Sequence, residues 1–235
     1  MFPLRDENPT VRKPYFTLLF MGLCILVFLM QIGSEKEDFS EIIYTYGFIP
    51  AKLFSNDYLP YSTNEVPAYY TLISSMFLHG GWMHLIGNMV FLWIFGNNIE
   101  DILGHGRFVL FYIGCGLVAA LAQMLSDPGS EIPMVGASGA VSGVMGAYII
   151  LFPRAKILTL LFLGIFITTM RISAGWFLGI WFAMQSFNAF ATVGIPGGGV
   201  AFWAHVGGFI AGIVFLFLLK PKGLTFSPRR KGPWG

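Results

Sequence analysis

Long runs of apolar side chains dominate this chain and leave few folds open to it. Of its 235 residues, 55% are hydrophobic and only 11% are charged, and the mean hydropathy is +0.69. A helix needs about twenty apolar residues to cross a bilayer, and six segments meet that length approximately. The sequence therefore predicts an all-α membrane protein, a bundle of six transmembrane helices. The six segments are 15–32, 83–102, 108–125, 138–152, 173–191 and 203–219.

Two stretches between these spans are partly apolar but too short or too broken to cross a bilayer. Residues 33–81 mix acidic and turn-rich segments with aromatic ones, so we expect short interfacial helices there. Residues 157–170 form an apolar run of fourteen residues that ends at Arg171. This length favours an interfacial or re-entrant piece over a seventh span. An odd number of spans would also place the two basic termini on opposite sides of the membrane.

The distribution of basic residues predicts the orientation of the chain. With six spans and the N-terminus inside, twelve of the fourteen Lys and Arg residues lie in inside segments, and only Lys36 and Lys52 lie outside. The positive-inside rule then places both termini in the cytoplasm. The predicted organisation is a cytoplasmic N-terminal segment (1–14), a six-helix membrane domain (15–219) and a basic cytoplasmic tail (220–235). The expected location is a bacterial inner membrane, in which the protein is multi-pass.

The composition also argues against several classes of partner. The formal net charge is only +2, and the basic residues lie at the chain ends and in short loops, so nucleic acid is not an expected partner. Both cysteines, Cys24 and Cys115, lie inside long apolar runs, where a thiol is usually a small buried hydrophobe. We expect no metal site and no cofactor. Membrane lipid is the expected surrounding for most of the chain.

Four polar residues fall at one membrane depth in this topology. Ser138 begins the fourth span from the outside, and His205 lies near the outer start of the sixth. His84 and Asn88 lie in the outer half of the second span, four residues apart and so on one helix face. Polar groups are costly to hold in hydrocarbon, so each needs a packing partner or a function. Taken singly, the serine is typical of a helix contact, the histidine of a packing or proton-relay residue, and the His-x-x-x-Asn pair of an interhelical clamp.

Small residues predict which helices approach each other closely. Ser138, Ser142 and Gly146 form a stripe at four-residue spacing on the fourth span, and Gly208 and Gly212 form a Gly-x-x-x-Gly seam on the sixth. If the two seams face each other, the hydroxyl of the serine and the ring of the sixth-span histidine come within hydrogen-bond reach. That geometry is the nucleophile and base pair of serine hydrolysis.

The sequence predicts a Ser138–His205 dyad rather than a triad, because no carboxylate is expected at this depth. An oxyanion formed at the serine would need other donors. The local candidates are His84, Asn88 and the backbone N–H of Ser138 at a helix N-terminus. The nearest acidic residues fall at the cytoplasmic end of the second span or in the outer loop before the serine, and they are Glu100, Asp101, Asp127 and Glu131.

Three motifs, "HLIGNM", "GASGAVSG" and "AHVGGFIAG", occur in this order on spans two, four and six. Together they resemble the rhomboid family of intramembrane serine proteases, from the first span through the sixth. The resemblance implies a six-helix core whose active site opens to the extracytoplasmic side. It also implies cleavage of single-pass transmembrane protein substrates, without metal or nucleotide. It makes Ser138 the nucleophile, His205 the general base, His84 and Asn88 the oxyanion pair, and Gly136 and Gly139 the glycines of the Gly-x-Ser-Gly motif.

One further stretch resembles the family, and two positions depart from it. "FGNNIEDILG" is similar to the family's Gly-x-x-x-Glu-x-x-x-Gly stretch through Gly96, Glu100 and Gly104, which we interpret as structural. Ser142 stands where some bacterial members carry a tyrosine that stacks on the catalytic histidine, so the histidine must be oriented differently here. The first outer loop has no arginine, whereas some members carry a Trp-Arg pair there.

Two elements are candidates for controlling access to the serine. The loop "TVGIPGGGVAF" before the sixth span contains Gly194, Gly197, Gly198 and Gly199, and it is either a movable cap or a tight connector. The fifth span is the lateral gate by analogy with the family. From the residues alone, its aromatic side chains are lipid-facing; they are Trp176, Phe177, Trp181 and Phe182.

Two other functions stay open at this point. One is a catalytically inactive relative that binds membrane clients, although such a protein is expected to lack the serine or the histidine. The other is a small channel or transporter whose histidines relay protons. A channel needs a polar path through both leaflets, and the inner half of the spans offers only a few polar groups such as Gln123, Gln185 and Asn188.

Overall fold

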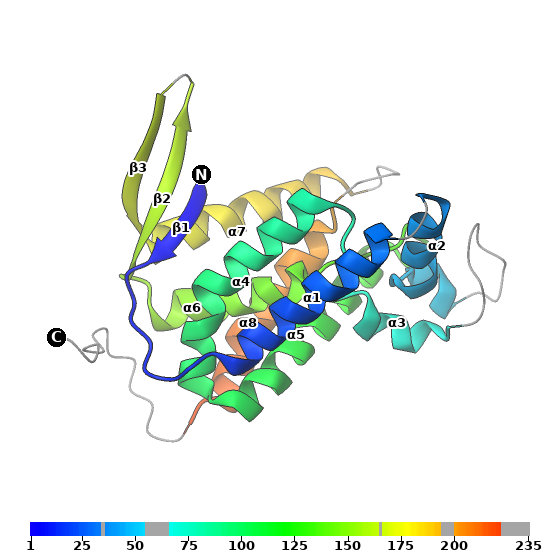
Figure 1. Cartoon of the computed structure of the whole chain (residues 1–235), viewed down its shortest axis with the longest axis horizontal. Coiled ribbons are helices and arrows are strands. Elements are labelled where there is room, and N and C mark those ends of the chain that lie inside the picture. Colours follow the sequence, from blue (N-terminus) through cyan, green and yellow to red (C-terminus); the bar gives the residue numbers. More distant parts are fainter. Residues whose placement is uncertain (34–35, 55–65, 165, 194–199, 222–235) are drawn as a thin grey trace.

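The protein is predominantly helical in this computed structural model, which describes all residues except 34–35, 55–65, 165, 194–199 and 222–235. Six long helices lie where the apolar segments predicted them (Figure 1). They are α1 (Tyr15–Gly33), α4 (Trp82–Leu103), α5 (His105–Ser126), α6 (Ser138–Leu151), α7 (Ala174–Ala191) and α8 (Phe202–Leu219). By length and apolar character, α1, α5 and α8 are the described helices that meet the requirement for crossing a membrane. The prediction of helices at these six places is confirmed.

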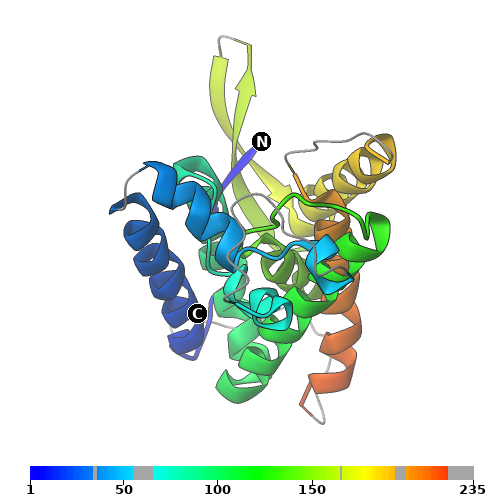
Figure 2. The ribbon, with the colours of Figure 1, turned by 90° about the vertical axis from the view of Figure 1, so that its right-hand side faces the viewer.

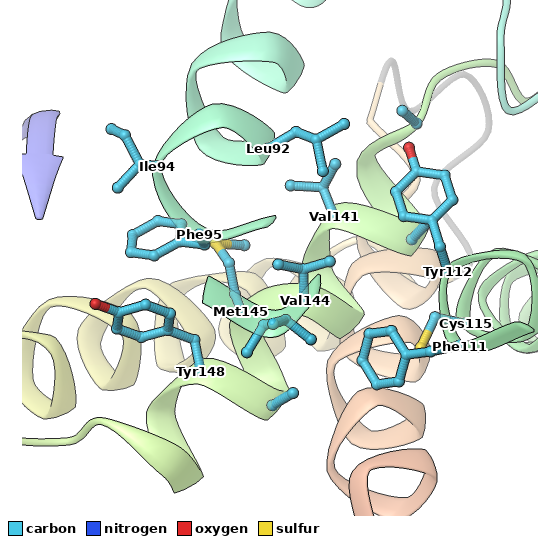
Figure 3. Close-up of a cluster of buried hydrophobic side chains, with 14 of the residues drawn as sticks. Leu92, Ile94, Phe95, Phe111, Tyr112, Cys115, Val141, Val144, Met145 and Tyr148 are labelled. Carbon is cyan, nitrogen blue, oxygen red and sulfur yellow. The ribbon is translucent and has the colours of Figure 1, made fainter. Parts of the chain in front are cut away.

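Helix α6 is the centre of the bundle and packs against α4, α5 and α8. Most of its side chains are buried, because small residues bring the neighbouring helices close on every side. Figure 3 shows large side chains of α4 and α5 meeting those of α6 in one apolar cluster. Phe95 of α4 packs edge-on against Tyr148 of α6, with ring centroids 4.9 Å apart. Helices α1 and α7 lie on opposite flanks of this core (Figure 2).

The close contact between α6 and α8 uses different glycines from those predicted. A Cβ atom on Gly208 or Gly212 would overlap the backbone carbonyl of Gly139 or Gly143. The seam of α6 is therefore a second Gly-x-x-x-Gly pair, one residue further on than the predicted stripe of Ser138, Ser142 and Gly146. Successive residues on a helix point about 100° apart, so the backbone contact with α8 is made beside the two serines, and their side chains line a cavity. The predicted partnership of α6 and α8 is confirmed. Of the predicted stripe on α6, Gly146 meets the backbone of Phe209 and Ser138 reaches α8 through its hydroxyl, whereas the hydroxyl of Ser142 bonds within α6.

The apolar run after α6, predicted as an interfacial or re-entrant piece, is a β-hairpin and not a seventh helical span. Strands β2 (Lys156–Leu163) and β3 (Phe166–Ser173) pair antiparallel, and Gly164 between them has a φ of +65°. Burial alternates along β2, because Ile157, Thr159 and Leu161 are buried while the residues between them are more exposed. A short apolar run does not by itself distinguish a strand from a helix, so the length of the run does not predict the hairpin. The hairpin projects clear of the helices (Figures 1 and 2).

The N-terminal segment, for which no secondary structure was predicted, completes this sheet. Strand β1 (Phe2–Asp6) pairs antiparallel with β2, which gives the order β1-β2-β3. The carboxylate of Asp6 accepts hydrogen bonds from the hydroxyl of Tyr148 (2.6 Å) and the side-chain amide of Asn98 (2.9 Å). Burial raises the pKa of Asp6 to about 6. Glu7 and Arg171 form an ion pair with a distance of 2.8 Å, so the segment is tied to both the helices and the hairpin.

Two adjacent carboxylates at the end of α4 hold the start of α1. Glu100 accepts the backbone N–H groups of Phe16 and Thr17 at 2.9 and 2.8 Å, and also the hydroxyl of Thr17 at 2.8 Å. Asp101 accepts the backbone N–H groups of the two residues at 11 and 12. These bonds satisfy donors that a helix N-terminus leaves without an intrahelical partner. The structural interpretation of the glycine–glutamate stretch agrees with these contacts, since a Cβ on Gly96 would also press on Thr17.

The region between α1 and α4 contains the short helices that were predicted. They are α2 (Lys36–Tyr46), the 3-10 helix η1 (Pro50–Leu53) and α3 (Ala68–Ser74). Phe48 pairs with Met134 through two backbone hydrogen bonds, which join this region to the segment that leads into α6. The outer loops thereby hold the approach to Ser138 in place.

Candidate active site

One cavity of about 1070 Å³ contains all four of the polar residues predicted to share a depth. His84 and Asn88 reach it from α4, Ser138 from the start of α6, and His205 from the first turn of α8. Its wall also includes the segment before α6 and side chains of α5 and α7. The serine and the histidine are half-buried, as a nucleophile that must meet both a substrate and water requires.

The predicted nucleophile and the predicted base are in hydrogen-bond contact. The Oγ of Ser138 lies 2.9 Å from the Nε2 of His205, although 67 residues separate them in sequence. This distance lies within the range for transfer of a proton from a hydroxyl to an imidazole. With its proton on Nδ1, the imidazole accepts the hydroxyl proton at Nε2. The pair therefore has the geometry that the predicted dyad requires.

The second nitrogen of the histidine has a partner that the sequence did not reveal as a site residue. The Nδ1 of His205 lies 2.8 Å from the Oε1 of Gln185 on α7. The ring of Trp181, one helical turn before Gln185, lies 5.8 Å from the imidazole ring, centroid to centroid. No carboxylate is among the hydrogen-bond partners of His205 in the described part of the chain. Gln185 therefore takes the position that the acid occupies in a triad.

The location of Gln185 corrects the sequence interpretation. It was placed with Gln123 in the inner half of the spans, but both glutamines lie at the level of the cavity. Gln123 lines the cavity and accepts the backbone N–H of Ala204 at 3.3 Å, next to the histidine. Asn188 follows Gln185 on α7 and bonds through its backbone oxygen to Thr192, which lines the same cavity. None of the three predicted polar residues therefore lies in the other half of the bundle, which weakens the channel interpretation.

Gly136 brings the predicted oxyanion pair together. It has a φ of +116°, and a Cβ atom on it would lie 2.6 Å from the Nε2 of His84 and 3.5 Å from the Nδ2 of Asn88. Only glycine fits this position, because both the backbone conformation and the space exclude a side chain. The two donors therefore flank the backbone two residues before Ser138.

The donors of this pair are available for a ligand. The backbone N–H of Gly80 donates to the Nδ1 of His84 at 3.4 Å, which leaves the Nε2 of that ring as the N–H donor. The Nδ2 of Asn88 is buried and has no hydrogen-bond partner among the described residues. A buried donor without a partner is unfavourable unless an acceptor arrives during function. Ser138 is the first residue of α6, so its own N–H also lacks an intrahelical acceptor.

Ser142, which stands at the position of the tyrosine in some rhomboids, does not touch the histidine. It is fully buried, and its hydroxyl donates to the backbone oxygen of Ser138 at 2.6 Å. Its contribution is to the first turn of α6. The hydrogen bond at the Nδ1 of His205 comes instead from α7.

The aromatic residues of α7 divide between lipid-facing and packed positions. Trp176 is exposed, but Phe177 is buried and only 6.4 Å from the ring of Phe91 on α4. Trp181 and Phe182 are half-buried and stack on Phe209 of α8. The prediction that all four face lipid is therefore wrong for three of them. The glycine-rich loop proposed as a cap, with Gly194, Gly197, Gly198 and Gly199, lies outside the described residues.

Neither cysteine lines this cavity. Cys24 and Cys115 are free and fully buried, which confirms the prediction of packing residues. In the described ranges of the chain, no group of three or more His, Cys, Asp and Glu side chains is arranged to hold a metal ion.

Comparison with known proteins gives a consistent set of relatives. Residues 67–222 match the rhomboid domain family. The chain is 30% identical to rhomboid protease GluP of Bacillus subtilis over 221 residues, which cover 92% of this chain and 37% of that protein. It is 31% identical to Rhomboid-like protein 11, chloroplastic, of Arabidopsis thaliana over 171 residues, 68% of this chain and 56% of that protein. It is 29% identical to Rhomboid protein 1, mitochondrial, of Saccharomyces cerevisiae over 166 residues, 69% of this chain and 45% of that protein. The matched part thus makes up between 37% and 56% of the length of these relatives.

Proposed function

The chain belongs to the rhomboid family, and we propose that it is an intramembrane serine endopeptidase that cleaves single-pass transmembrane proteins with a Ser138–His205 dyad. The observation that carries this proposal is the 2.9 Å distance between the Oγ of Ser138 and the Nε2 of His205. The unpartnered Nδ2 of Asn88 in the same cavity supports it, because a site for an oxyanion needs such a donor.

The proposed topology has six spans and two cytoplasmic termini. The distribution of basic residues supports it. The arrangement of the helices supports it too, because α1 begins and α8 ends at the same end of the bundle (Figures 1 and 2). Ser138 and His205 lie in the first turns of α6 and α8, toward the other end. The cavity then opens on the extracytoplasmic side. The proposed host membrane is a bacterial inner membrane. Because some relatives are named chloroplastic or mitochondrial, the host membrane has to be measured separately from the activity.

Acylation begins when the Nε2 of His205 takes the proton from the Oγ of Ser138. The oxygen attacks the carbonyl carbon of the scissile peptide bond and forms a tetrahedral intermediate, whose negative charge lies on the former carbonyl oxygen. The Nε2–H of His84, the Nδ2 of Asn88 and the backbone N–H of Ser138 donate hydrogen bonds to that oxygen. The carbon–nitrogen bond then breaks, and the imidazolium gives its proton to the leaving amine.

Deacylation repeats these steps with water as the nucleophile. His205 takes a proton from the water, and the oxygen attacks the ester carbonyl. When the intermediate collapses, the proton returns from His205 to the Oγ of Ser138, and the carboxylic acid product leaves. The half-exposed serine and the large cavity supply the water that this step consumes.

The decisive experiment is labelling of the purified protein with a fluorophosphonate, together with cleavage of single-pass transmembrane proteins in proteoliposomes. The expected result is labelling of the wild type, loss of labelling and cleavage in Ser138→Ala, and no change in Ser74→Ala. Ser74 is a suitable matched control because its hydroxyl donates to the backbone oxygen of Tyr46, away from the cavity. Equal labelling of the wild type and Ser138→Ala would refute the nucleophile. A folded wild type that neither reacts nor cleaves would favour a client-binding protein.

A further inference from the structure

Two residues of α7 support the imidazole of His205 from the side opposite Ser138. Gln185 accepts at its Oε1 a hydrogen bond from the Nδ1 of His205, at 2.8 Å. The ring of Trp181 lies 5.8 Å from the imidazole and is tilted by 39° to it. Gln185 follows Trp181 by four residues, so both project from one face of α7.

A carbonyl oxygen such as the Oε1 of Gln185 can only accept a hydrogen bond. Contact with this oxygen therefore requires the proton of the neutral imidazole to be on Nδ1. The lone pair of Nε2 then faces the Oγ of Ser138, 2.9 Å away, as a general base requires. In the opposite tautomer, an Nε2–H would face the serine and could not take its proton.

We propose that Gln185 is a positioning residue that holds His205 in the tautomer and ring orientation needed to activate Ser138. The proposal rests on the proposed proteolytic function. Gln185 would perform the role that an acid performs in a Ser-His-Asp triad, and that a tyrosine at the position of Ser142 performs in some members of the family. Among the described residues, the two hydrogen bonds of the His205 ring go to Ser138 and Gln185. A residue that orients a histidine through its second nitrogen has a large effect on function in many sites.

A neutral amide suits this position because it orients the ring without placing a charge in an apolar region. A carboxylate there would lie among the aromatic side chains of α7 and α8, where burial of a charge is costly. The amide stabilises the imidazolium formed during acylation less than a carboxylate would. Gln185 therefore orients the ring of His205 correctly but raises the basicity of that ring less than a carboxylate would.

The location of Gln185 on α7 also links the base to the packing of that helix. Phe182, three residues earlier, stacks on Phe209 of α8 with ring centroids 4.4 Å apart. Gln185 reaches His205 only while α7 packs on α8 in this way. The hydrogen bond from the Nδ1 of His205 therefore depends on the packing of α7 against α8.

Two substitutions separate the hydrogen bond from the shape of the side chain. Gln185→Met keeps the length of the side chain and removes the acceptor, so kcat for cleavage and the rate of fluorophosphonate labelling should both fall about tenfold, with KM changed less than about threefold. Gln185→Glu restores an acceptor and should recover most of this rate at alkaline pH. Because its carboxylate stabilises the imidazolium, the acidic limb of the pH–rate profile should move to higher pH by about one unit. Met184→Ala is the matched control, since Met184 is exposed on the same helix and should leave the rate and the pH profile unchanged.

A measurement that needs no proteolysis tests the tautomer directly. In protein labelled with ¹⁵N-histidine, the His205 signals, identified by their loss in His205→Ala, should report a proton on Nδ1 in the wild type and a mixture of tautomers in Gln185→Met. A proton on Nε2 in the wild type would overturn the proposal. So would equal labelling rates for Gln185→Met and the wild type, or a Gln185→Glu variant with no shift in its pH profile. If the wild type itself neither labels nor cleaves, the proposed proteolytic function fails instead, and the tautomer measurement still decides the role of Gln185.

Discussion

Gly208 of α8 lies so close to Gly139 of α6 that a methyl group on it would overlap the carbonyl of Gly139. Gly139 directly follows Ser138, and Gly208 comes three residues after His205. The contact therefore fixes how the nucleophile and the base stand relative to each other. Two residues without functional groups thus determine the distance on which the proposed chemistry depends.

The next turn of the same seam offers a test away from the cavity. Gly212→Ala places a methyl group on the backbone of Gly143, so α6 and α8 must separate. We expect the free energy of unfolding in mixed micelles to fall by about 1–3 kcal/mol, and the rate of cleavage to fall with it. Gly22→Ala is the matched control, because a Cβ at Gly22 of α1 meets nothing within 4 Å. Equal unfolding free energies for the two variants would contradict the close backbone contact between Gly143 and Gly212.

Asn88→Ala should lower activity without lowering stability. The Nδ2 of Asn88 makes no hydrogen bond to the described residues, so its removal breaks no hydrogen bond with them. If the donor stabilises the oxyanion, kcat should fall roughly 10²- to 10³-fold, while the unfolding free energy changes by less than about 1 kcal/mol. Kinetics and unfolding measured on the same preparation give both values. A loss of stability that matched the loss of activity would make Asn88 a structural residue.

The sequence predicted the parts of the fold that depend on local pattern. Apolar runs of sufficient length located six helices, because a helix in lipid must present apolar side chains nearly all round. The four-residue spacing of His84 and Asn88 correctly placed them on one face. The motifs around Ser138 and His205 then identified helices that do meet.

The sequence does not predict features that depend on how one helix is rotated against another. Ser138 and Gly139 begin two adjacent stripes of small residues, at 138/142 and 139/143, and only the packed bundle shows which stripe faces α8. Gln185 contacts a histidine twenty residues away on an antiparallel neighbour, a pairing that no local spacing encodes. The hairpin was missed for another reason: the prediction used only the length of the apolar run, although six of its fourteen residues are β-branched Ile or Thr, which favour strands.

Glu100→Ala should destabilise the bundle more than any exposed acidic substitution. Glu100 is buried and accepts three hydrogen bonds from Phe16 and Thr17, and it also contacts the Nδ1 of His105 at 2.6 Å. Loss of these bonds leaves buried donors at the start of α1 without partners, at a cost of about 2–4 kcal/mol. Asp38→Ala, at an exposed position of α2, should stay within about 0.5 kcal/mol of the wild type. Chemical unfolding of the two variants makes the comparison, and a similar small effect for both would contradict the role of Glu100.

The pH dependence of stability should report the burial of Asp6. Burial raises its pKa to about 6 in the folded protein, from a value near 3.8. The folded state therefore binds the proton more tightly than the unfolded chain does. The resulting stabilisation is complete below about pH 4 and is lost as the pH rises through about 6, with a maximum size of about 3 kcal/mol.

Asp6→Asn isolates this contribution, because an amide oxygen can still accept the hydrogen bond from Tyr148 but does not titrate. Between about pH 4 and pH 7 the unfolding free energy of the wild type should fall relative to that of the variant, whereas Asp38→Asn should run parallel to the wild type. The same difference should appear as faster hydrogen exchange at neutral pH in β1 and in the part of β2 that pairs with it, since Asp6 ties that strand to Asn98 and Tyr148. Parallel profiles for the wild type and Asp6→Asn would mean that the carboxylate is ionised at all of these pH values, and that the strand is held by its backbone pairing alone.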